Sequence, residues 1–199
     1  MKKGLISVLC VMLLSAFMPA TQLIDCLTNF DGTGQYKKFR ADHNGAMSKP
    51  FRVVKTAKGD EEITVIDNYR IAYHNAKEAT TVSVKIEKSA ADGYAVDQEI
   101  IRDNLLYIVQ HTRNLSYQQP DSLNFNGTNV YGYTKSKVDS SSFIGSYLFF
   151  PGDDYTVYVN FHLGKENPAA YSSLDQFISQ RDQFLRKYIE QLKKCGKWK

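Results

Sequence analysis

The stretch TNVYGYTKSKVDSSSFIGSYLFFPGDDYTVYVNFHL, residues 128–163, decides the fold of this chain. It holds three segments rich in tyrosine, phenylalanine and valine, at 128–138, 142–150 and 155–163, and such residues favour β-strands. The connections 139–141 and 151–154 consist of Asp, Ser, Pro and Gly and have the length of hairpin turns. Successive strands joined by tight turns pair antiparallel, so the stretch predicts a three-stranded meander.

The segment 80–87 predicts a further strand, because its apolar and polar residues alternate. Val82, Val84 and Ile86 face one way, and the other way face the polar residues Thr81, Ser83, Lys85 and Glu87. This pattern is typical of a half-buried antiparallel strand. Shorter strands are predicted at 51–54, 62–67, 69–73 and 122–125, the last ending at a turn made by Asn126 and Gly127.

Two helices are predicted from residues that recur at helical spacing. Ser173 to Gln176 reads as a capping box, and an apolar stripe follows it: Leu174, Phe177, Ile178, Phe184, Leu185, Tyr188, Ile189 and Leu192. A mid-chain helix is expected over 96–112, with Asp97 in its first turn. The order of elements predicts an α+β fold: a mostly antiparallel sheet with a mid-chain helix and a long C-terminal helix packed on it.

The N-terminus has the features of a secretory signal peptide. Lys2 and Lys3 precede an uninterrupted apolar run from Gly4 to Phe17, and Ala20 offers a small residue for cleavage. We therefore expect a signal peptide at 1–20, a loosely ordered N-terminal segment at 21–50, a single α+β domain at 51–195 and a basic tail at 196–199. The expected location is the periplasm or the medium.

Cleavage of the predicted signal peptide would remove Cys10 and leave two cysteines. Cys26 and Cys195 lie at opposite ends of the mature chain, and a pair of cysteines in an exported domain predicts a disulfide. The alternative is a lipid anchor on Cys26. Leu23 lies three residues before it, as in a lipobox, but Asp25 stands where a small residue is expected.

The charge of the chain argues against nucleic acid as a partner. Loss of Lys2 and Lys3 leaves 23 basic against 21 acidic residues, a net charge of about +2, which is too small. Basic residues gather only near the C-terminus: Arg186, Lys187, Lys193, Lys194, Lys197 and Lys199. They suit the negative end of a helix dipole, and a peripheral contact with an anionic membrane, aided by Trp198, is the alternative.

Signatures of catalysis or metal binding are missing from the sequence. There is no G-x-S-x-G and no H-E-x-x-H, and His43, His74, His111 and His162 are widely spaced. We therefore expect no catalytic residue, no metal and no cofactor. An enzyme whose residues converge only in space is kept as an alternative.

One face of the meander is a candidate binding surface. Tyr158, Asn160 and His162 alternate with the apolar face of the last strand, and Tyr131 and Tyr133 lie on another strand of the meander. Exposed aromatic residues on a sheet suit a partner. The alternative is that these tyrosines lie beneath a helix or beneath the N-terminal segment.

The layout resembles the PsbP-like domain family. The resemblance covers roughly residues 51–194 and rests on the segments GTNVYGYTKSKV, SSFIGSYLFF, YTVYVNFHLG and SLDQFISQRDQFLRKYIEQL in this order. That family includes extrinsic photosystem proteins and small bacterial envelope proteins of the DcrB kind, and it has an α/β/α sandwich without a shared catalytic constellation. The resemblance implies a noncatalytic envelope protein that binds a protein or another envelope component. A small-ligand binder, with a pocket between the sheet and the C-terminal helix, is the other alternative.

Overall fold

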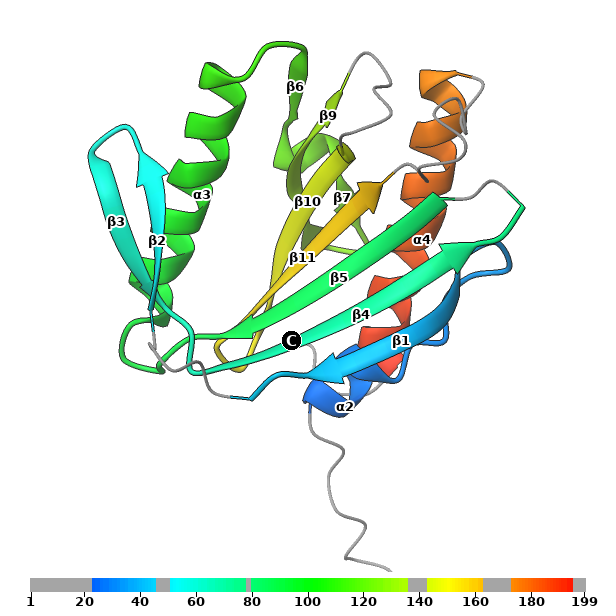
Figure 1. The fold of residues 1–199 in the computed structure, drawn as a ribbon, viewed down its shortest axis with the longest axis horizontal. Coiled ribbons are helices and arrows are strands. Elements are labelled where there is room, and N and C mark those ends of the chain that lie inside the picture. The colour runs from blue at the N-terminus through cyan, green and yellow to red at the C-terminus, as the bar shows by residue number, and fades with distance from the viewer. Residues whose placement is uncertain (1–22, 46–50, 78–79, 136–142, 163–172, 195–199) are drawn as a thin grey trace, which may run out of the picture.

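The computed structural model describes residues 23–45, 51–77, 80–135, 143–162 and 173–194 (Figure 1). Its main element is a seven-stranded sheet with the order β1-β4-β5-β11-β10-β9-β6, in which every neighbouring pair is antiparallel. Helices lie on both faces of this sheet. The α+β fold with a mid-chain and a C-terminal helix is therefore confirmed.

The predicted meander forms the centre of the sheet. Its strands are β9 (Tyr131–Lys135), β10 (Phe143–Gly152) and β11 (Tyr155–His162). The turn between β10 and β11 is tighter than predicted, because β10 runs on to Gly152 and only Asp153 and Asp154 connect the strands. Both aspartates have positive φ, a conformation that Asp tolerates in two-residue hairpins.

The other strands of the sheet lie partly before and partly after the mid-chain helix in the sequence. β5 (Thr80–Lys88) pairs with β11, and then follow β4 (Asp67–Asn75) and β1 (Lys37–His43) at one edge. β6 (Leu115–Gln118) forms the other edge beside β9. A short 3-10 helix (Pro120–Ser122) leads to the small hairpin of β7 (Asn124–Phe125) and β8 (Thr128–Asn129), at the predicted Asn126-Gly127 turn.

The segment 23–45 differs from the expectation of a loosely ordered segment over 21–50. Residues 23–45 contain α2 (Leu23–Thr28) and the edge strand β1. Leu23, Leu27 and Tyr36 are nearly fully buried in the main core. Burial of these side chains stabilises the helix and the strand of this segment, which its polar composition does not predict. The predicted signal peptide and the tail 196–199 lie outside the described residues.

One face of the sheet is closed by α4 (Leu174–Lys194) together with α2. The Ser173 hydroxyl accepts a hydrogen bond from the Gln176 amide at 3.1 Å, as the capping box predicts. Most aromatic rings of this core pack edge to face, with Phe184 lying 5.9 Å from Phe161 and 5.1 Å from Tyr73 between ring centroids. Among the described residues, aromatic side chains pack between the sheet and the C-terminal helix. The small-ligand pocket proposed there as an alternative stays a prediction.

The other face is covered only in part. α3 (Tyr94–His111) and the hairpin of β2 (Phe51–Thr56) and β3 (Gly59–Thr64) pack together on it. The Asp97 carboxylate accepts hydrogen bonds from Thr64, at 2.6 Å from the hydroxyl and 3.2 Å from the amide, and so joins α3 to the hairpin. Figure 1 shows this layer on the side of the sheet opposite α4.

Candidate functional site: a cationic cleft on the sheet

The half-covered face of the sheet carries two polar rows that run across the strands. In the first row, Arg70 of β4 pairs with Lys85 of β5, which pairs with Tyr158 of β11. In the next row, Ser83 of β5 pairs with Asn160 of β11. These side chains share one face because the residues of a strand alternate between its two faces.

A buried ion-pair network lies where the β2–β3 hairpin meets this face. The carboxylate of Glu87, whose side chain is 8% exposed, accepts a hydrogen bond from Lys85 Nζ at 2.8 Å and from Arg52 Nη2 at 2.9 Å. Arg52 Nη2 also donates to the Tyr158 hydroxyl at 2.9 Å, and Lys85 Nζ lies 4.2 Å from the centroid of the Tyr158 ring. The network anchors the hairpin to β5 and β11.

The pKa values in this network are shifted by burial and by neighbouring charges. Burial alone would raise the pKa of Glu87, but Lys85 and Arg52 outweigh it and lower the pKa. The pKa of Lys85 is lowered, chiefly by burial; Glu87 opposes this shift, whereas Arg52 and Arg70 add to it. Burial raises the pKa of Tyr158, so its hydroxyl stays protonated.

Beside the network lies an open cleft of about 250 Å³. Its lining consists of Arg70, Ser83, Val84, Lys85, Asn160 and His162. His162 Nε2 is 2.8 Å from the Ser83 hydroxyl, and Asn160 Oδ1 accepts a hydrogen bond from the Ser146 hydroxyl at 2.6 Å. Burial lowers the pKa of His162, which favours its neutral form. Every lining residue except Val84 carries a side-chain group that can donate a hydrogen bond, although most of the exposed surface of the cleft is apolar.

The structure separates the five residues of the predicted binding surface. Asn160 and His162 line the cleft. Tyr131, Tyr133 and Tyr158 instead pack with the apolar side chains of α3 and the β2–β3 hairpin, and Tyr133 is only 8% exposed. The tyrosines therefore lie beneath the covering layer, which is the alternative that the sequence left open, and they do not form an exposed aromatic surface.

The remaining residues of the site were not singled out by the sequence analysis. The alternation in β5 does place Ser83, Lys85 and Glu87 on one polar face, so a signal for these three exists. Arg70 and Arg52 carry no such signal. They join the site only through the pairing of β4 with β5 and through the folding of the hairpin over the sheet.

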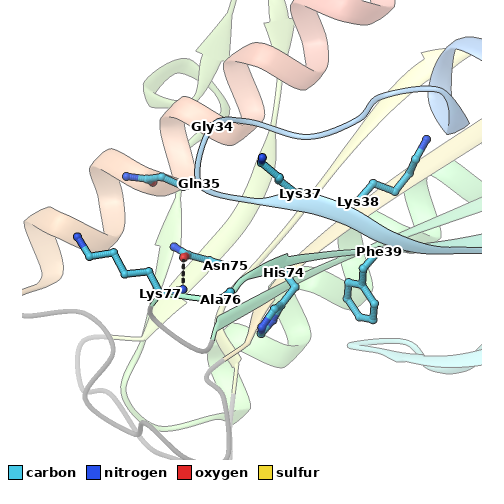
Figure 2. A pocket seen from close by; sticks show the side chains of 9 residues that line it. All are labelled: Gly34, Gln35, Lys37, Lys38, Phe39, His74, Asn75, Ala76 and Lys77. Carbon is cyan, nitrogen blue, oxygen red and sulfur yellow. Dashed lines mark hydrogen bonds between the residues drawn. The ribbon is translucent and has the colours of Figure 1, made fainter.

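A second hollow, of about 590 Å³, lies at the β1 edge of the sheet. Figure 2 shows Lys37 and Lys38 on one side of β1 and Phe39 with His74 on the other. Lys38 is engaged with Asp31 at 3.2 Å, and Phe39 contacts the His74 ring edge to face. Because these side chains do not converge, and because lysines commonly protect an edge strand from pairing, this hollow is the weaker candidate.

Metal ligands do not gather in the part of the chain that the structure describes, where no three His, Cys, Asp or Glu side chains lie together. Among the same residues, no helix is both long and apolar enough to cross a membrane. Cys26 is 1% exposed in α2, whereas Cys195 lies just beyond the described residues. The disulfide between them stays a prediction.

Comparison with known protein families, with curated proteins and with solved structures found no match to this chain.

The position of His162 predicts a pH dependence of stability. Its pKa is lowered in the folded protein, so below about pH 6.5 the unfolded chain binds the proton more readily. We expect the free energy of unfolding to fall as the pH decreases from about 6.5 through the folded-state pKa. Urea unfolding at a series of pH values measures this, and the variant His162→Gln should lose this part of the dependence. The exposed His74 provides the control, and a His74→Gln variant with the same loss would contradict the assignment.

Proposed function

We propose that this protein is a noncatalytic, exported binding protein, of the PsbP-like type, that holds a protein partner or another envelope component against its half-covered sheet face. The observation that carries the proposal is the cleft between Arg70, Lys85 and His162. It is open and has cationic residues in its lining, whereas the opposite face of the sheet is filled by the aromatic core under α4. The leader-like N-terminus supports export.

The surroundings of the cleft favour binding over catalysis. Ser83 and His162 are close enough for nucleophile and base, but Ser83 lies in the middle of a strand. The strand β5 is paired on both sides, with β4 and with β11, so its backbone amides are engaged in the sheet and cannot stabilise an oxyanion. The carboxylate of Glu87 is held by Lys85 and Arg52.

Site-specific photocrosslinking in the native host tests the proposal. A photoreactive residue replaces Ala72, which pairs with Ser83 beside the cleft, and the matched control replaces the exposed Gln183 on α4, across the sheet. We expect position 72, but not position 183, to capture one reproducible, near-stoichiometric partner identified by mass spectrometry. Capture from neither position, or equally from both, would overturn the proposal.

The Ser83–His162 contact also supports a second candidate function, a hydrolase that acts by acyl transfer. The hydroxyl would attack an ester or amide carbonyl while the imidazole accepts its proton. The C–O or C–N bond would then break as the imidazolium returns the proton to the departing alcohol or amine, and water would hydrolyse the acyl ester on Ser83. A fluorophosphonate probe distinguishes the two functions. Labelling that maps to Ser83 and disappears in Ser83→Ala would establish the hydrolase, and an unlabelled protein would leave the binding function as the stronger proposal.

A further inference from the structure

The charges around the cleft are not balanced among the described residues. Arg52, Lys85 and Arg70 bring three positive charges to this face, and Arg52 and Lys85 share the carboxylate of Glu87. Both of its oxygens already accept a hydrogen bond, one from Lys85 and one from Arg52. Arg70 is exposed and lies directly across from Lys85 in the sheet register. Asp42 lies opposite Arg70 in the sheet register, but its carboxylate is ion-paired with Arg40 at 2.6 Å. An anion in the cleft would therefore relieve the repulsion that Arg52 and Arg70 exert on Lys85.

The hydrogen-bonding groups of the cleft also favour an anion. The carbonyl oxygen of Asn160 accepts from Ser146, which leaves the amide nitrogen as the donor that the cleft can use. Lys85 has three N–H donors and spends one on Glu87. If His162 Nε2 donates to the Ser83 oxygen, the Ser83 hydroxyl is free to donate to a ligand. A ligand with several acceptor oxygens satisfies this lining.

We propose that the cleft between Arg70, Ser83, Lys85 and Asn160 binds a phosphate group. The inference rests on the proposed binding function and names the chemistry that the cleft recognises. The donors come from three neighbouring strands, β4, β5 and β11. Arginine binds a phosphate group through two parallel N–H donors of its planar guanidinium, and lysine binds it through the compact charge of its ammonium group. At about 250 Å³, the cleft is below the range of about 300–1,000 Å³ typical of whole small-molecule sites, so it suits one charged group of a larger ligand.

Titration of the mature protein with inorganic phosphate, followed by NMR of the His162 imidazole and the Asn160 side-chain amide, tests the inference. We expect saturable shifts that sodium chloride at equal ionic strength does not produce. Arg70→Gln should weaken binding about ten-fold because a charge-assisted hydrogen bond is lost. Arg113→Gln, which changes an exposed arginine outside the cleft lining, should bind as the wild type does. No saturable shift, or an equal response to acetate, would overturn the inference.

A second arm identifies the source of the phosphate group. Sedimentation with phosphatidylglycerol vesicles, lost in Arg70→Gln, would point to a lipid headgroup. Phosphate binding without vesicle binding would point to a soluble phosphate or phosphate ester. The photocrosslinking result is independent of both arms: a partner captured at position 72 by a protein that does not bind phosphate would overturn this inference alone and leave the proposed function standing.

Discussion

The variant Cys195→Ser is expected to have a free energy of unfolding about 4–5 kcal/mol lower than that of the oxidised wild type, because a disulfide from Cys26 to Cys195 would close a loop of nearly the whole chain that follows the predicted signal peptide. Such a loop strongly restricts the unfolded ensemble. Cys26 lies in α2, which is packed against α4, and Lys194 at the end of α4 immediately precedes Cys195. The hydrogen bond of 2.7 Å from the Tyr188 hydroxyl to the Leu27 carbonyl joins the same two helices.

Urea unfolding with and without reductant provides the matched control. Reductant should bring the wild type to the stability of Cys195→Ser and leave the variant itself unchanged. Intact mass separates the alternatives: two free thiols, or a diacylglyceryl group on Cys26, would contradict the disulfide. Leu23 and Ile24 are buried in the core, and cleavage before Cys26, which a lipid anchor requires, would remove them.

The second large effect is expected for Glu87→Gln, which should lower the free energy of unfolding by about 2–3 kcal/mol. The substitution keeps the shape of the side chain but leaves Lys85 and Arg52 without their counter-charge. Removing one partner of a fully buried pair costs about 3–5 kcal/mol. We expect the smaller loss of about 2–3 kcal/mol for Glu87→Gln because Lys85 and Arg52 are 26% and 31% exposed, so water screens their charges in part.

Chemical denaturation of two further variants isolates this effect. Glu62→Gln changes an exposed glutamate on β3 and should alter stability by less than about 0.5 kcal/mol. Adding Lys85→Met to Glu87→Gln should recover part of the loss, because one uncompensated cation disappears. The pKa of Glu87 is lowered in the folded state, so its contribution is present above the unfolded pKa of about 4.3 and is lost as the pH falls through the folded pKa. A Glu87→Gln variant as stable as the wild type at neutral pH would show that the network is not stabilising.

The elements that the sequence predicts well are those with a strong local period. The C-terminal helix, the mid-chain helix and the last two strands of the meander agree with their predicted positions, apart from small shifts at their ends. The predicted strand 128–138 is instead divided into β8, which pairs with β7, and β9 of the main sheet, and its last three residues lie outside the described residues. The N-terminal strand β1 was missed because its residues, KKFRADH, are mostly exposed at the sheet edge and show no apolar alternation. Its place in the sheet follows from pairing with β4, a contact between segments far apart in the sequence.

Part of the candidate site follows from the sequence of single strands, and part follows only from the tertiary structure. Alternation along β5 and β11 by itself determines that Ser83, Lys85 and Glu87 share a polar face and that Asn160 and His162 share another, because successive side chains of a strand point to opposite sides. Only the tertiary structure decides that these two faces are one, that α3 and the β2–β3 hairpin bury the tyrosines, and that Arg52 and Arg70 reach the cleft. Pairing between distant strands and the docking of a hairpin on a sheet arise from contacts between residues remote in sequence, which leave no periodic signal along the chain.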